Sequence, residues 1–211
     1  KILKLQMKKL KFKKKINLIK YTDLKILNLN NSSINLIDVK YNQKLAFQKI
    51  SNRSKNYIKK CFDTAFKIIK LGLAYKLVNG PISKKKFLDK KFLGMTEYIS
   101  QNFSSKNNAM LIFNKNLSVC PLTTHLPIKL VSKKINRNLI IKKVKLIDIF
   151  YKKNLGYNPK IAVTGLNPHC ESSEKKNEDI NIIKPSIKYL ENQGFNISGP
   201  YSADTIFLKK N

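Results

Sequence analysis

The sequence lacks several features that would place it in a particular class of protein. It has no run of about 18 or more apolar residues, and therefore no segment that predicts a membrane span. It has no charged and then apolar leader of the kind that directs secretion. Its three cysteines are an odd number without paired spacing, which argues against a disulfide framework and for a reducing compartment. We therefore expect a cytoplasmic protein with no membrane partner.

Acidic residues and arginine are also scarce, although the chain is strongly basic. Lysine and arginine number 43 against 12 acidic residues, which gives a net charge of +31. Only Arg53 and Arg137 are arginine, whereas nucleic-acid sites favour arginine because its planar fork binds phosphate and guanine with two hydrogen bonds. The abundance of lysine, asparagine and isoleucine is typical of a coding bias toward A and T. We expect mostly solvated lysines and no specific nucleic acid; a basic nucleic-acid-binding α/β protein is the alternative.

Apolar residues make up 42% of the 211 positions, which is enough for a folded core. They recur at helical spacing in three segments. Helices are therefore predicted from Ser51 or Asn52 to near Gly72, through Ile140 to Tyr151, and through Ile180 to Leu190, where Pro185 marks a kink or a late start. Short apolar runs predict strands at residues 15–21, 34–41, 77–78, 109–113, 117–120, 160–165 and 195–200.

The alternation of strands and helices predicts an α/β protein with a mixed, largely parallel sheet and flanking helices. The lysine-rich start of the chain differs in character from the rest. We therefore expect residues 1–50 to form a basic N-terminal segment with short strands, and residues 51–211 to form the α/β core.

The chain has only two histidines, and both lie in Pro-bounded loops that follow a predicted strand. His125 lies in "TTHLP" and His169 in "TGLNPHCE". Ligands of open α/β sheets bind at the carboxyl ends of the strands, and imidazole is the commonest protein ligand for metals such as zinc. Half of a metal site and two locally hydrogen-bonded histidines are both consistent with this pattern. Asp204 is the nearest candidate carboxylate, or else a cap, and Cys170 is a possible metal neighbour.

Five motifs occur in an order that resembles the 4-hydroxythreonine-4-phosphate dehydrogenase family. They are "LVNGPISK" at 77–84, "GMTEY" at 94–98, "TTHLPI" at 123–128, "AVTGLNPH" at 162–169 and "SGPYSADTIF" at 198–207. The resemblance runs from about Ser51 to Phe207, and residues 1–50 carry little of it. The chain has no GxSxG, GxxxxGK[ST] or GxGxxG motif, so a dinucleotide would not bind through the usual glycine fingerprint.

The resemblance implies a fold like that of isocitrate and isopropylmalate dehydrogenases. It implies a homodimer whose active site lies between two domains at the subunit interface. The family uses NAD and a divalent metal cation (zinc, magnesium or cobalt) held by three histidines. It oxidises 4-phosphohydroxy-L-threonine, which then loses carbon dioxide to give 3-amino-2-oxopropyl phosphate for pyridoxal phosphate biosynthesis.

The same resemblance assigns roles to four positions. His125 and His169 match two of the metal ligands, and Thr96 matches a substrate-binding threonine. Met95 stands where the family has a substrate-binding histidine, so a related dehydrogenase of another phosphorylated hydroxy acid is an alternative. Cys170-Glu171 replaces the family's Ala-Gly.

The third metal histidine of the family is expected beyond Asn211, and the family's N-terminal Gly-Asp-Pro region has no counterpart after Lys1. The chain is therefore expected to be the middle of the enzyme, cut at both ends. Residues 51–211 would be an incomplete part of the catalytic core. We expect residues 1–211 alone to be inactive.

Overall fold

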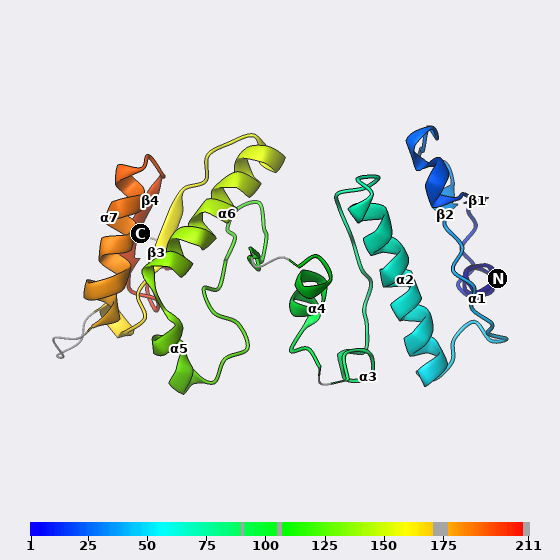
Figure 1. Cartoon of the computed structure of the whole chain (residues 1–211), viewed down its shortest axis with the longest axis horizontal. Coiled ribbons are helices and arrows are strands. Elements are labelled where there is room, and N and C mark those ends of the chain that lie inside the picture. Colours follow the sequence, from blue (N-terminus) through cyan, green and yellow to red (C-terminus); the bar gives the residue numbers. More distant parts are fainter. Residues whose placement is uncertain (90, 105–106, 171–176, 209–211) are drawn as a thin grey trace. The chain divides into compact units, whose positions relative to one another are not determined.

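The structure is a computed structural model that describes residues 1–89, 91–104, 107–170 and 177–208. The chain forms two compact units, Lys1–Ser104 and Ser105–Asn211 (Figure 1). Within the described residues, every helix is too short or too polar to cross a membrane. The boundary between the units falls inside the segment that the sequence assigns to the α/β core, and the division of roles at residue 50 stays a prediction.

The first unit contains short strands and several helices. Its elements are α1 (Ile2–Lys9), β1 (Ile16–Leu18), the 3₁₀ turn η1 (Tyr21–Lys25), β2 (Ile34–Leu36), α2 (Asn52–Lys70), α3 (Lys84–Phe87) and α4 (Met95–Asn102). β1 and β2 pair in parallel, with Ile16 opposite Ile34. The two predicted N-terminal strands are therefore present but shorter than expected.

Helix α2 forms the backbone of the first unit's core. Ser51 caps it: its hydroxyl accepts the amide hydrogen of Ser54, whose own hydroxyl accepts that of Ser51. Phe62 and Phe66 lie one helical turn apart and are both buried. They pack in an aromatic cluster with Tyr98, whose ring centroid lies 5.6 Å from Phe62 and 5.8 Å from Phe66. The predicted cap and the predicted apolar face of this helix are confirmed.

The second unit is an α/β arrangement around one parallel strand pair. Its elements are α5 (Ile128–Lys134), α6 (Arg137–Leu155), β3 (Ile161–Thr164), the turn η2 (Pro168–Cys170), the π-helical turn η3 (Asp179–Ile183), α7 (Lys184–Asn192) and β4 (Ile197–Tyr201). Figure 1 shows β3 and β4 side by side with α7 next to them.

The core of the second unit is aliphatic. Its buried residues come from α6, η3, α7, β4 and the residue after α5: Ile135, Ile140, Val144, Ile183, Ile187, Leu190 and Ile197. Pro185 lies in the first turn of α7, directly after the π-helical turn η3, so the helix predicted from Ile180 to Leu190 is present and changes from π to α geometry just before Pro185. Gly199 of β4 has φ +132°, and a Cβ there would lie 2.4 Å from the carbonyl oxygen of Val163. The close approach of β4 to β3 therefore requires glycine at this position.

The parallel pairing of both strand pairs confirms the α/β, largely parallel prediction. The predicted strand at Leu77 and Val78 is wrong: neither residue is in a strand, and the Val78 side chain is 95% exposed. Leu77 is half-buried against the aromatic cluster, whereas Val78 faces solvent, because no neighbouring strand supplies the ladder hydrogen bonds for this two-residue run. The strands predicted at 109–113 and 117–120 are reduced to one antiparallel bridge between Ile112 and Val119. Helices α1, α3, α4 and α5 were not predicted.

Candidate functional site: the loop after strand β3

The chain leaves β3 at Gly165 and turns back through a loop that ends at Cys170. The amide hydrogen of Gly165 is donated to the carbonyl oxygen of Tyr201, 2.9 Å away, at the end of β4. A Cβ on Gly165 would lie 2.6 Å from Cys170 Sγ and 3.0 Å from Asp179 Oδ1. Because both neighbours crowd this position, only glycine leaves the loop its observed path.

A buried carboxylate holds the middle of this loop. Asp179 is 1% exposed. Its Oδ1 accepts the backbone N–H of Leu166 at 2.7 Å, and its Oδ2 accepts the backbone N–H of Asn167 at 3.1 Å and the side-chain amide of Asn167 at 2.9 Å. Asp179 was not among the candidate residues, and it lies just before the third helix that the sequence predicts from Ile180.

His169 follows in the left-handed conformation, with φ 59° and ψ 9°. Its ring is exposed, and Nδ1 lies 3.5 Å from Asp204 Oδ2 and 3.5 Å from Ser202 Oγ. The structure thus brings the candidate carboxylate Asp204 to the candidate ligand His169. This occurs because β3 and β4 run in parallel, so that the residues after both strands meet at one edge.

The electrostatics of this group favour one form of the imidazole. The Ser202 hydroxyl donates a hydrogen bond to Asp204, and this bond, with a smaller contribution from His169, holds the pKa of Asp204 below its usual value. With the Ser202 proton directed at Asp204, Nδ1 faces two acceptors. A proton on Nδ1 is therefore favoured, and it leaves the Nε2 lone pair for a ligand.

His125 lies in the exposed loop before α5, also in the left-handed region, with φ 57°. An L-residue in this conformation carries a cost of roughly 1–2 kcal/mol relative to the right-handed region. Residues with such a strained backbone conformation often occur at functional sites. The ligand role of His125 and its predicted closeness to His169 stay predictions.

The two candidate substrate-binding residues lie at the start of α4. Met95 packs against the aromatic cluster of the first unit, and Thr96 is exposed in the first helical turn. The next residue, Glu97, has a buried carboxylate oxygen without a hydrogen-bond partner. The substrate contacts of Met95 and Thr96 stay predictions.

The donors fit a divalent cation in part. Among the described residues, no group of three or more histidine, cysteine, aspartate or glutamate side chains is close enough together to hold a metal ion. Nevertheless, His169 has Nδ1 beside a carboxylate, which is the arrangement that orients metal-bound histidines in proteins. His169 and His125 are therefore suitable donors, and a complete site needs at least one more. Glu171, beside Cys170, lies outside the described residues.

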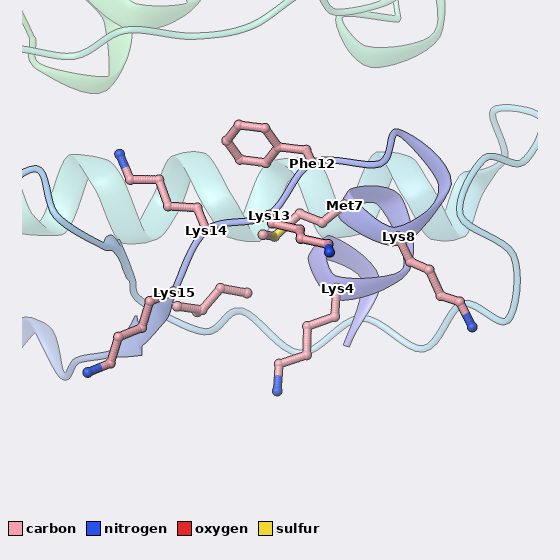
Figure 2. A pocket seen from close by; sticks show the side chains of 8 residues that line it. Lys4, Met7, Lys8, Phe12, Lys13, Lys14 and Lys15 are labelled. Atoms are coloured by element: carbon pink, nitrogen blue, oxygen red, sulfur yellow. The ribbon is translucent and has the colours of Figure 1, made fainter.

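Two cavities lie in the first unit, and neither is lined by a predicted site residue. One, of about 610 Å³, is lined by Lys4, Lys8, Lys13, Lys14 and Lys15 together with Met7, Phe12 and Ile16. Figure 2 shows that the ammonium groups point in different directions instead of converging on one point. The other, of about 300 Å³, is mainly apolar and includes Tyr57, whose pKa burial raises to about 12. Neither geometry is that of a site for a phosphorylated acid.

Comparisons with known proteins agree on one family. The family model of the pyridoxal phosphate biosynthetic protein PdxA matches residues 1–211. The chain is 44% identical to a 4-hydroxythreonine-4-phosphate dehydrogenase from Wigglesworthia glossinidia brevipalpis over 143 residues, which are 64% of this chain and 42% of that protein. It is 34% identical to the enzyme of that name from Neisseria meningitidis serogroup A over 166 residues, which are 75% of this chain and 50% of that protein.

A solved structure of a putative 4-hydroxythreonine-4-phosphate dehydrogenase from Salmonella typhimurium has the same fold, with a TM-score of 0.80 at 23% identity. The match covers 98% of this chain and 65% of that structure. A more distant relative is named D-threonate 4-phosphate dehydrogenase, from Pectobacterium atrosepticum, and is 27% identical over 153 residues. The chain spans about half the length of the relatives that it matches.

Proposed function

Since the chain belongs to the PdxA family of pyridoxal phosphate biosynthetic proteins, we propose that the protein is an NAD-dependent 4-hydroxythreonine-4-phosphate dehydrogenase. It would oxidise the secondary alcohol of 4-phosphohydroxy-L-threonine, and loss of carbon dioxide would give 3-amino-2-oxopropyl phosphate. We further propose a homodimer with the active site at the subunit interface, as the resemblance implies.

The observation that supports this proposal most directly is the contact between His169 and Asp204. Both residues lie in motifs that carry the resemblance, and the parallel pair β3–β4 brings them to the same edge. In the proposed site His125 and His169 hold a divalent cation, whose Lewis acidity lowers the pKa of an alcohol when bound. Asp204 keeps the proton of His169 on Nδ1, so that Nε2 stays available as a donor.

Removal of the metal tests the proposal. In the whole protein that carries this chain, treatment with a chelator should abolish NADH production from 4-phosphohydroxy-L-threonine, and added zinc, magnesium or cobalt should restore it. The control is the same treatment with a chelator that has first been saturated with Zn²⁺, which leaves the bound cation in place. Full activity in the chelated protein would contradict the metal-dependent reaction.

A second substrate class is favoured by one specific residue. Met95 lies where the family's histidine is expected, and its thioether cannot replace the hydrogen bonds of an imidazole. A relative with 27% identity is named for D-threonate 4-phosphate. The ratio of kcat/KM for the two substrates distinguishes the two functions. A Met95→His variant should shift that ratio toward 4-phosphohydroxy-L-threonine if Met95 sets the preference.

A further inference from the structure

The loop that presents His169 is fixed at three points by groups from other elements. Gly165 is bound to Tyr201 at the end of β4, and Leu166 packs against the aliphatic core. Asp179, the first residue of η3, takes both backbone N–H groups that follow Gly165 and also the side chain of Asn167. Of these contacts, those of Asp179 involve the only charged group.

The Asp179 carboxylate is 1% exposed, so holding the loop with it requires the burial of a charged group. Burial of a charge is unfavourable unless several hydrogen bonds compensate for the lost water. Here three N–H donors do so, and a fourth polar group secures the backbone of Asp179 itself: Asn177, which is 2% exposed, accepts the Asp179 amide hydrogen at 2.8 Å. The whole cluster is therefore built around the Asp179 carboxylate.

The hydrogen bonds from Leu166 and Asn167 to Asp179, here called the clamp, lie close to His169 in the chain and therefore affect its position. Asn167 is separated from His169 by a single residue. The amide of Cys170 donates a hydrogen bond to the carbonyl oxygen of Asn167 at 3.1 Å. Asp179 Oδ2 binds both the backbone N–H and the side-chain amide of Asn167, and it therefore also limits where the His169 ring can lie.

We propose that Asp179 is a positioning residue for His169: its carboxylate fixes Leu166 and Asn167 so that the imidazole reaches Asp204 with one nitrogen and a divalent cation with the other. The inference rests on the proposed metal role of His169. Loss of an outer partner of a metal-bound histidine lowers metal affinity by about tenfold to a hundredfold in other proteins. A similar decrease is expected when the clamp is broken.

The test is the Zn²⁺ affinity of the protein, measured by competition with a chromophoric chelator, for Asp179→Asn. Asparagine keeps the shape but places an NH₂ group against N–H donors, so at least one hydrogen bond is lost. We expect the affinity for Zn²⁺ to fall by about tenfold or more. Ser186→Ala is the matched control: Ser186 is fully buried in the same unit, and its hydroxyl donates to the carbonyl oxygen of Ile182 in η3.

Each result decides between distinct conclusions. A decrease for Asp179→Asn with unchanged affinity for Ser186→Ala supports positioning by Asp179. An unchanged affinity for Asp179→Asn, with a decrease for His169→Ala, overturns the positioning role and leaves the proposed function intact. An unchanged affinity for His169→Ala overturns both. If Asp179→Asn does not fold, Asn167→Ala, which removes only the side-chain part of the clamp, is judged by the same criteria.

Discussion

A glycine at position 169 is expected to give a more stable protein than an alanine there, although both substitutions remove the imidazole. The reason is the backbone conformation of His169, with φ 59° and ψ 9°. A side chain with a Cβ in this region costs roughly 1–2 kcal/mol. Glycine avoids that cost but loses more backbone entropy on folding, which offsets about 0.5–1 kcal/mol of it.

The balance predicts that His169→Gly unfolds with a free energy about 1 kcal/mol greater than His169→Ala. Urea denaturation followed by circular dichroism measures this difference. In the same samples, both variants should lose Zn²⁺ affinity relative to the wild type. We therefore expect His169→Gly to be more stable than His169→Ala and to have lost Zn²⁺ affinity relative to the wild type. Such a combination is typical of a residue whose backbone conformation serves chemistry and not folding.

Two outcomes would refute this reasoning. Equal stability of the glycine and alanine variants would mean that the left-handed conformation of His169 is not strained. A glycine variant that still binds Zn²⁺ as the wild type does would mean that the imidazole is not a ligand.

Further predictions concern the strand pair, acid stability and the basic charge. Gly199→Ala should lower the free energy of unfolding by several times more than Gly156→Ala. Both glycines have positive φ, but of the two only Gly199 lies against another backbone. Urea titration of the two variants measures the difference. The pKa of Asp204 is lowered in the folded protein, so Asp204 stabilises the fold above its unfolded pKa of about 3.9, and this contribution is lost as the pH falls through the lower folded pKa. Thermal unfolding of wild type and Ser202→Ala should therefore differ at neutral pH and converge in acid. Binding to duplex DNA should be weak and disappear by about 200 mM salt in a filter or fluorescence assay, whereas a sequence-specific complex at that salt would favour the nucleic-acid alternative.

Local sequence patterns were sufficient for the long helices and for one edge of the site. Helix α6 follows from the spacing of Ile140 and Val144, and it ends at Gly156 in the left-handed conformation. The meeting of His169 with Asp204 also follows from sequence, since parallel strands bring their C-terminal loops to one edge.

Long-range contacts explain what the sequence did not reveal. Asp179 lies 13 and 12 positions from the two backbone groups that it holds, and no local periodicity marks such a bond. The error at Val78 has a related cause, because a strand depends on a neighbouring ladder that a two-residue apolar run does not specify. The short helix α5 contains no buried residue, so it has no apolar pattern to detect.

The central claim is that His169 takes part in a metal-dependent dehydrogenase reaction. The most direct test is NADH production from 4-phosphohydroxy-L-threonine, with zinc or cobalt present, by the whole protein that carries this chain and by its His125→Ala and His169→Ala variants. We expect activity in the wild type and a loss of several orders of magnitude in both variants, because activation of the alcohol would be lost. An unimpaired His169→Ala protein would contradict the account.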